Sequence, residues 1–573
     1  MIVEVFHDNP EVQLYYRFAM IESEDYLWSD WSEYTGALCF TAIGEYRVEA
    51  YAVAPGLTPS YICIAEFYVQ EPDPHDDMYY RQISDFGVDG IYYRYTSDST
   101  VMVSMNDTYD YPYTEPFGWE LYSVGPYSGD VIIPPTVEYK GNIFTVEGID
   151  NHAFINCALT SITLPNTIKY ILSKAFVHAT IESGSIFIPA SVTTIEPGAF
   201  ADCYDLNSVR VEENNPVYDS RDNCNAIIET ATNTLAVAFN ASTMPSTVTA
   251  IGDNAFAGDA YSGWAYYSGC SLTDYVIPNS IKTIGNKAFY LCTGLNSVDF
   301  DNELTSIGDY AFAICNNLKN VTIPDKTITI GNGAFAHCYN LNSAIIGNSV
   351  TSIGDEAFYM CDGLVNLSIG NSVKSIGKEA FWRCDQLTSI IFPNSVESIG
   401  DLAFNECSGL TSITFGDALT SIGRSAFSDC SGLKSIKIPN SVTSIGQHAF
   451  YRCTGLQRII CMSIPPLDID SERFNCYGIN IYEQATLFVP AEAVAVYRAH
   501  GEWGKFLRIV PFIGAGPGDI NGDGNIAIND VTGLIDMLLS DEEQPAWLDV
   551  NGDGAVNVKD ITELIDILLN GDN

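Results

Sequence analysis

Positive charge is scarce in this 573-residue sequence, in which 26 Lys and Arg stand against 72 Asp and Glu for a formal net charge of −46. So acidic a chain repels a phosphate backbone and an anionic membrane surface, so we expect no nucleic-acid partner. No apolar run approaches the ~20 residues that cross a bilayer, so we expect no membrane span. The charge balance favours divalent cations instead.

Catalytic motifs are missing as well. The seven histidines form no His-Glu-x-x-His pair and no evident triad, and there is no Gly-x-Ser-x-Gly elbow or phosphate-binding loop. The residues after Met1 are strand-like and lack the basic and apolar segments of a signal peptide. We therefore expect a protein that is not an enzyme, and, if it is exported, a trimmed or partial chain.

What the sequence does contain is a period of 23 residues. Eight of the sixteen cysteines follow it, an Ala-Phe pair ends three residues before each of them, and a Leu stands three residues after. These cysteines are Cys292, Cys315, Cys338, Cys361, Cys384, Cys407, Cys430 and Cys453. Small disulfide-rich domains do not space cysteines in this way, whereas a column of repeats does. We expect a buried stack of thiols, with occasional disulfides between neighbouring turns sterically conceivable.

One unit reads Ile-Gly-x-x-Ala-Phe-x-x-Cys-x-x-Leu-x-Ser-Ile-x-Ile-Pro-Asn-Ser-Val-Thr-Ser. Its centre alternates like a strand, which predicts Ile436 and Ile438 facing inward and Ser435 and Lys437 facing outward. Pro-Asn-Ser ends that strand, and the Gly of Ile-Gly allows a tight turn. No unit can bury its Phe, Leu and Ile alone, so the units must stack into a right-handed solenoid with a parallel sheet on one face.

Two insertions interrupt the array. The first, residues 209–246, predicts an extra hairpin. The second carries Tyr261, Trp264, Tyr266 and Tyr267, which either pack on the solenoid or form a binding patch for sugars or proteins. The same two possibilities apply to the aromatic residues that follow the repeat Phe on separate turns, Tyr359, Trp382 and Tyr451.

This pattern resembles the BspA type of bacterial surface leucine-rich repeat. The resemblance covers residues 78–513, including an N-terminal cap at 78–147 and a C-terminal cap at 461–513. It implies a secreted or cell-surface protein that binds a host or bacterial surface protein, without naming the ligand.

Residues 1–71 are rich in aromatic and β-branched residues and have no helical period. Stretches such as Leu14-Tyr15-Tyr16-Arg17 resemble the small β-sandwich appended to chitobiases and hexosaminidases. That resemblance implies an accessory domain without catalytic residues.

The C-terminal region holds two twelve-residue loops with the spacing of calcium ligands. The first, residues 519–530, offers Asp519, Asn521, Asp523, Asn525 and Asp530. The second, residues 549–560, offers Asp549, Asn551, Asp553, Ala555, Asn557 and Asp560, with Ala555 contributing its backbone carbonyl. A helix is expected after each loop, but Gly and Pro residues exclude a full helix before it.

Two such half EF-hands in tandem resemble a type I dockerin, over residues 518–573. The resemblance implies an all-α module that binds two Ca²⁺ ions and docks on a cohesin outside the cell. Partner choice in that family depends on loop positions 10 and 11, which here are Ile528-Asn529 and Val558-Lys559 rather than Ser or Thr. The crowded carboxylates predict that calcium binding and folding are coupled.

The sequence thus predicts a mainly β protein with three domains: a β-sandwich (1–71), the solenoid (78–513) and the dockerin (518–573). We expect a non-catalytic binding or adhesion protein that calcium tethers to a cohesin. An alternative is an accessory glycan-binding component of a cellulosome-like, polysaccharide-degrading complex. A site hidden in the solenoid would make it an enzyme, but the repeats cluster no acid, base and nucleophile.

Overall fold

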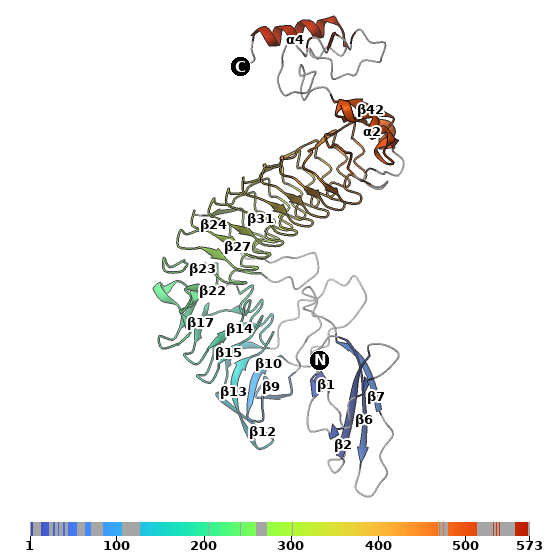
Figure 1. Ribbon diagram of the computed structural model, residues 1–573. Helices are drawn as coiled ribbons and strands as arrows, with labels where there is room; N and C mark the ends of the chain where they lie inside the picture. Colours follow the sequence, from blue (N-terminus) through green and yellow to red (C-terminus); the bar gives the residue numbers. More distant parts are fainter. Residues whose placement is uncertain are drawn as a thin grey trace. The chain divides into compact units, whose positions relative to one another are not determined.

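A computed structural model describes residues 84–105, 127–203, 206–240, 242–258, 272–300, 302–467, 480–512 and 556–570, with a few residues between these ranges. It also describes the backbone of strands within residues 1–69. The chain separates into two compact units, Met1–Gln82 and Ile83–Asn573 (Figure 1).

The first unit contains antiparallel strands. Strand β2 pairs with β6 over nine residues, and β6 pairs with β7, in a sheet of order β3-β2-β6-β7 to which β4 adds by pairing with β2. Strands β1 and β5 form a separate pair. The bounds are β1 Ile2–Val3, β2 Gln13–Ile21, β3 Leu27–Trp28, β4 Ser32–Glu33, β5 Leu38–Cys39, β6 Gly44–Val53 and β7 Cys63–Val69. A second face that would make this unit a sandwich stays a prediction.

The second unit begins with a β cap that closes the N-terminal end of the solenoid core. Phe86 and Tyr93 are buried there, and Arg94 forms an ion pair with the fully buried Asp150. The cap strands are β8 Phe86–Val88, β9 Ile91–Tyr95, β10 Thr100–Ser104, β11 Ser128–Ile132, β12 Thr136–Tyr139 and β13 Asn142–Ile149. Pairing changes from antiparallel to parallel between β10 and β13, where the repeats begin.

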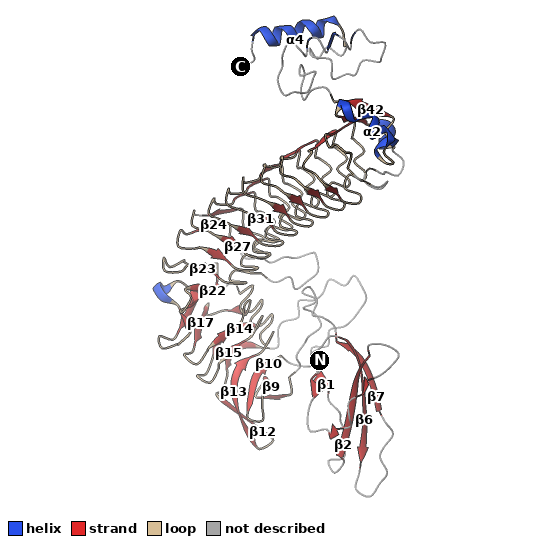
Figure 2. Ribbon diagram, in the orientation of Figure 1, coloured by secondary structure: helices blue, strands red, loops and turns tan. Residues whose placement is uncertain are grey.

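The repeats build two rows of parallel strands (Figure 2). The first row is the strand predicted in each unit: β14 Ala158–Thr163, β16 Thr180–Ile181, β17 Ser185–Ile188, β19 Ser208–Val211, β24 Asp274–Ile277, β26 Ser297–Phe300, β28 Asn320–Thr322, β30 Ser343–Ile345, β32 Asn366–Ser368, β34 Ser389–Ile391, β36 Ser412–Thr414, β38 Ser435–Ile438 and β40 Arg458–Cys461. In β38 the residues alternate exposed and buried, which confirms the predicted inward Ile436 and Ile438.

The second row was not predicted. It consists of two-residue strands at the Thr-Ile or Ser-Ile of each turn, and most of them belong to one twelve-stranded sheet. They are β15 Tyr170–Ile171, β18 Thr194–Ile195, β23 Ala250–Ile251, β25 Thr283–Ile284, β27 Ser306–Ile307, β29 Thr329–Ile330, β31 Ser352–Ile353, β33 Ser375–Ile376, β35 Ser398–Ile399, β37 Ser421–Ile422 and β39 Ser444–Ile445.

The repeat phenylalanines form two parallel stacks inside the solenoid, one from Phe154 to Phe200 and one from Phe256 to Phe450. Phe358, for example, lies between Phe335 and Phe381, with ring centroids 5.2 and 5.1 Å apart and the rings nearly parallel. The backbone N–H of Phe358 donates to the carbonyl of Ala380 on the next turn. Since each ring is fully buried by its neighbours, the stack explains why the Ala-Phe pair recurs without change.

Successive turns approach so closely that the Ile-Gly position admits no side chain. A Cβ on Gly354 would lie 2.6 Å from the carbonyl atoms of Gly331. The glycine is therefore required by the contact between turns, which differs from the tight turn expected from the sequence. The next residue reinforces this contact, because the side chain of Asn332 accepts the N–H of Asp355, and Asp355 in turn accepts that of Lys378.

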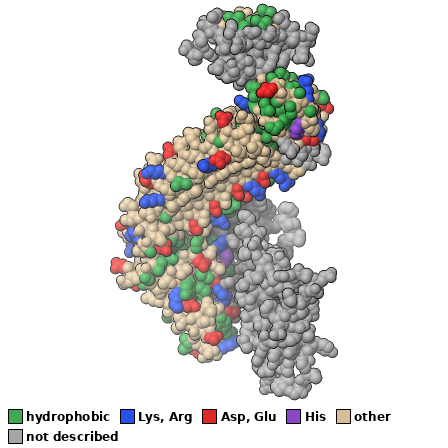
Figure 3. All heavy atoms as spheres, viewed as in Figure 1, with side chains coloured by type: hydrophobic (Ala, Val, Ile, Leu, Met, Phe, Trp, Pro, Cys, Tyr) green, Lys and Arg blue, Asp and Glu red, His purple; other side chains and the backbone are tan. Residues whose placement is uncertain are grey.

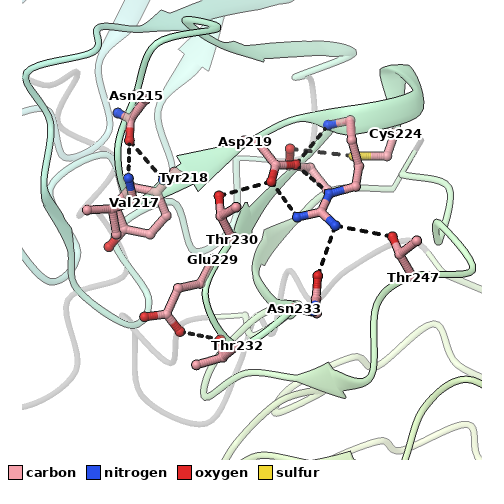
Figure 4. Close-up of polar contacts among 12 residues, drawn as sticks. Asn215, Val217, Tyr218, Asp219, Cys224, Glu229, Thr230, Thr232, Asn233 and Thr247 are labelled. Atoms are coloured by element: carbon pink, nitrogen blue, oxygen red, sulfur yellow. Dashed lines mark hydrogen bonds and ion pairs between the residues drawn. The ribbon is translucent and has the colours of Figure 1, made fainter.

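The first insertion forms the predicted hairpin. Strands β21 Ala226–Glu229 and β22 Thr234–Ala238 pair antiparallel, and β20 Tyr218–Asp219 pairs with β21. A short 3₁₀ turn, Arg221–Asn223, connects β20 to β21. Arg221 holds this segment through Asp219, Asn233 and Thr247 (Figure 4). Phe239, which follows β22, meets Phe200 edge-on and interrupts the parallel stack.

The C-terminal end of the solenoid is closed by short helices over two further strands. These elements are α1 Ile481–Gln484, β41 Thr486–Val489, the 3₁₀ turn Ala491–Ala493, α2 Val494–Ala499, the 3₁₀ turn Trp503–Lys505 and β42 Arg508–Pro511. Trp503 is fully buried there and packs against Phe474, with the two rings tilted by 57°. Helix α4, Val558–Asn570, lies at the end of the second calcium loop. No described helix has the length and apolar composition to cross a membrane.

Candidate functional site

The structure describes the final residues of the second predicted calcium loop. Asn557 stands before the first residue of α4, and its side chain accepts the N–H of Lys559 at 2.9 Å. Asp560 reaches back to the N–H of Asn557 at 2.7 Å. This reciprocal pair is a capping box, so the loop ends in a preformed helix start.

Asp560 is fully buried, so its carboxylate is held at the inner side of this turn. Asn557 and Asp560 occupy loop positions 9 and 12, and both offer oxygen atoms, which is the ligand type that Ca²⁺ prefers. The oxygen donors of these two residues fit the chemistry of a calcium ion. Bound calcium would supply the positive charge that these loops, rich in carboxylates, lack.

The other predicted calcium ligands lie outside the described residues. These are Asp519, Asn521, Asp523, Asn525, Asp530, Asp549, Asn551, Asp553 and Ala555. The same holds for Ile528 and Asn529 and for the aromatic insertion Tyr261, Trp264, Tyr266 and Tyr267. Within the described part, residues 531, 534, 535 and 538 are helical, as expected after the first loop.

The two half-hands expose matching apolar positions. Val558, at loop position 10, is 72% exposed, and Lys559 beside it is exposed too. Ile535 and Ile565 stand thirty residues apart at equivalent places of the two copies, and each is 37% exposed. Leu534 and Leu564, one residue earlier, are fully buried. Each copy thus buries one leucine and leaves the isoleucine beside it partly exposed.

The buried thiols of the cysteine column are not reactive. From Cys315 to Cys453, each thiol donates to the carbonyl of the repeat Phe on the preceding turn, at 3.0 to 3.4 Å. These thiols are fully buried and form no disulfide, as predicted, and burial raises the pKa of Cys338 to about 12. Cys292, at the head of the column, is disulfide-bonded.

Two of the aromatic residues singled out in the repeats come together. Tyr359 and Trp382 meet edge-to-face with centroids 5.1 Å apart, and His337 meets Tyr359 at 5.3 Å. Tyr339 joins them, because its hydroxyl is 3.0 Å from His337 Nδ1. Tyr451 instead packs near His448, apart from this group. Tyr339 could not be recognised from the repeat spacing. It stands three positions later in its own unit than Tyr359 does in the following unit.

Comparison with known families decides the identity of the repeats. A model described as BspA type leucine rich repeat region matches residues 142–262, 263–388 and 374–482, which is more than half of the chain. The chain belongs to the BspA-type leucine-rich repeat family. A second model, the dockerin type I domain, matches residues 517–569 of this BspA-type chain.

Both families are non-catalytic, and both are typical of extracellular or cell-surface proteins. A dockerin type I domain binds calcium and implies a cohesin partner. The BspA-type chain therefore combines a leucine-rich repeat surface-protein fold with a docking module.

Several solved structures with similarity to this BspA-type chain are leucine-rich repeat proteins. One from Bacteroides ovatus is 23% identical, with 68% of this chain and 99% of the other covered and a TM-score of 0.36. One from Eubacterium ventriosum is 19% identical, covering 64% and 93%, with a TM-score of 0.38. A leucine rich cell surface protein from Faecalibacterium prausnitzii is 20% identical, covering 77% and 98%, with a TM-score of 0.27. No curated protein matches the chain significantly.

Proposed function

We propose that this protein is a secreted or cell-surface binding protein whose solenoid recognises a macromolecule and whose dockerin anchors it to a cohesin. The observation that carries the proposal is the tandem pair of calcium loops within the region that matches the dockerin family. The capping box at Asn557 and Asp560 supports it, since it prepares the end of the second loop for helix and ligand together.

The proposed docking mode uses two calcium ions and the exposed residues that begin each helix. Ligands would come from Asp519 to Asp530 in the first loop and from Asp549 to Asp560 in the second. Ile528, Asn529, Val558 and Lys559 would contact the cohesin. The exposure of Val558 supports this role, and its apolar side chain favours a cohesin surface that does not depend on hydroxyl hydrogen bonds.

Domain boundaries are proposed at 1–71, 78–513 and 518–573, with the first domain as an accessory β-sandwich. The sheet order β3-β2-β6-β7 supports a β domain there.

Calcium titration of the full chain by calorimetry, followed by capture on a panel of type I cohesins, tests this proposal. We expect two bound ions and calcium-dependent capture. Asp523→Asn combined with Asp553→Asn should abolish both, because each removes a central ligand of one loop. Asp417→Asn, an exposed carboxylate on the solenoid, is the matched control and should change neither. Calcium-independent behaviour of the wild-type chain would refute the tether.

A second candidate function is an accessory glycan-binding component of a cellulosome-like complex. The aromatic insertion Tyr261, Trp264, Tyr266 and Tyr267 favours it, because rigid rings stack on sugars. Loss of glycan-array binding on replacing Trp264 and Tyr266 by Ala would support this function, whereas protein binding without a glycan signal would support the first.

A further inference from the structure

Four half-buried rings from three consecutive turns form one surface of the solenoid, which we name the aromatic edge: His337, Tyr339, Tyr359 and Trp382. In the column of Tyr359 and Trp382 the two positions on either side hold no ring, since Ala313 and Ala336 precede Tyr359 and Asn405 and Ser428 follow Trp382. Rings return in this column only farther along the solenoid, at Tyr290 and Tyr451. The repeat itself does not require rings here. The aromatic edge is thus a local departure from the repeat.

The rings of the aromatic edge stand at steep angles to one another. The interplanar angle is 87° between Tyr359 and Trp382 and 70° between His337 and Tyr359. Such rings form walls rather than the coplanar platform on which a pyranose lies flat. The faces of Trp and Tyr rings also carry partial negative charge, which attracts Lys and Arg side chains.

Carboxylates outnumber cations around the aromatic edge. The phenol of Tyr359 lies in the field of Glu356, Glu379 and Glu406, and Asp385 lies close enough to Asp362 to repel it. Two cations offset them, since Lys378 pairs with Glu379 at 3.0 Å and Arg383 with Glu406 at 3.6 Å. Burial lowers the pKa of His337, so that ring adds no positive charge at neutral pH.

Two polar atoms of this region have no hydrogen-bond partner among the described residues. They are Oδ1 of Asp362 and the indole N–H of Trp382, and both are shielded from solvent. Burial, with repulsion from Asp385, raises the pKa of Asp362 more than the nearby Arg383 lowers it. Asp362 lies near a second carboxylate, Asp385, and one of its oxygens accepts no hydrogen bond from the described residues. A cation bound here would therefore lower the free energy of both carboxylates.

We propose that the aromatic edge, with Glu356, Asp362 and Asp385 around it, binds a basic segment of a partner protein through Lys or Arg side chains set against Tyr359 and Trp382. This inference rests on the proposed binding role of the solenoid and assigns its partner class. The steep ring angles and the excess negative charge favour a cationic peptide over a neutral glycan.

Calorimetry of the full chain at 150 mM NaCl tests this assignment with hexalysine as the probe. Hexalysine in which every side-chain amine is acetylated is the matched uncharged peptide, and cellohexaose is the neutral sugar. We expect hexalysine to bind and the other two not to bind. Trp382→Ala and Tyr359→Ala should each weaken hexalysine binding at least tenfold, whereas Trp382→Phe should retain most of it because an aromatic face remains.

Two controls separate the aromatic edge from the general acidity of the chain. Tyr451→Ala removes a ring from the same repeat column outside the aromatic edge and should leave the affinity unchanged. Asp362→Asn with Asp385→Asn should weaken binding, whereas Glu138→Gln with Glu492→Gln, which removes the same charge elsewhere, should not. Because the Asp pair leaves the rings in place, this comparison holds even if Trp382→Ala fails to fold.

Equal binding of hexalysine by all variants, or none by the wild-type chain, would overturn the proposal. Cellohexaose binding that the same ring substitutions abolish would overturn it too, by assigning a glycan to the aromatic edge. Cohesin capture of each variant should remain at the wild-type level. A failure of capture in every chain, wild type included, would count against the tether and leave the hexalysine result unaffected.

Discussion

Glycine at the Ile-Gly position is required by a contact that the neighbouring residues in the sequence do not reveal. The backbone of Gly354 has no left-handed conformation, and the constraint comes from the preceding turn, which leaves no space for a Cβ. The sequence correctly indicated that glycine matters there. It could not give the reason, because the contact joins residues 23 positions apart.

Gly354→Ala should therefore destabilise the solenoid by about 1–3 kcal/mol, because the methyl group must push two turns apart. Urea unfolding followed by circular dichroism measures the change. Gly501→Ala is the matched control, since nothing lies within 4 Å of the added Cβ, and it should alter stability by less than about 0.5 kcal/mol. Equal effects of the two substitutions would contradict the packing argument.

The buried thiols predict a stability that depends on alkaline pH. Burial raises the pKa of Cys338 from 9.0 to about 12, so the folded chain holds this proton more tightly than the unfolded chain does. The stabilisation is complete below pH 9 and is lost progressively as pH rises toward 12. The urea midpoint should fall between pH 8.5 and 10, and Cys338→Ala should make the decline shallower. A midpoint that does not change over this range would refute the linkage.

At the scale of single turns, stability depends on how each element meets its two neighbours. Phe381 touches Phe358 on one side and Phe404 on the other, at 5.1 and 5.0 Å. Phe381→Ala should cost about 3–5 kcal/mol, since it leaves a cavity that both neighbouring turns line. Phe187→Ala, on the 51% exposed ring of β17, is the control and should cost less than about 0.5 kcal/mol in the same denaturation experiment. Comparable losses at the two positions would mean that the stack is not what holds the turns together.

The hairpin is held by a different kind of contact. Arg221 donates to both carboxylate oxygens of Asp219 and to the side-chain oxygens of Asn233 and Thr247. Lysine offers one compact ammonium in place of this planar fork. Arg221→Lys should thus increase cleavage of the hairpin by chymotrypsin, whereas Arg424→Lys, in the regular repeats, should not. Unchanged cleavage would show that the hairpin holds without Arg221.

These elements also show how far sequence reasoning reaches. The alternation of Ser435–Ile438 was visible because four residues suffice to display a period of two. The second row of strands was not, because Ser444–Ile445 is too short to alternate. Only half of the aromatic edge could be recognised from the sequence. Tyr359 and Trp382 share a repeat position, whereas His337 and Tyr339 join the group from other positions of the unit. Side chains from different positions of neighbouring units can be in contact without producing any repeat in the sequence.

For the whole molecule, net charge opposes compactness. A formal charge of −46 over 573 residues places like charges close together, and the folded chain holds them closer than the unfolded chain does. Raising NaCl from 10 to 300 mM should raise the urea midpoint, because the Debye length shrinks from about 30 Å to below 8 Å. A midpoint that stays constant or falls with salt would show that ion pairs such as Lys326–Glu303 outweigh the repulsion.

The solenoid and the predicted calcium loops differ in whether they need a bound ion to keep their structure. In the described part of the repeats no cluster of His, Cys, Asp or Glu could hold a metal ion, whereas we expect the crowded carboxylates of the loops to need calcium. Chelation of calcium should therefore leave the β-sheet signal of the repeats intact while cohesin capture is lost.

The constant spacing of the turns has a consequence for descent. Since the regular turns between Phe289 and Phe450 contact one another through the same backbone and Phe atoms, one of them can be duplicated or deleted in the gene without disturbing the fit of the rest. Such a change of copy number alters the length of the protein by whole steps, and it leaves both ends, with their caps, untouched. Lineages can thus lengthen or shorten this protein by copying errors alone, and selection is left to act on the few positions where one copy differs from the next.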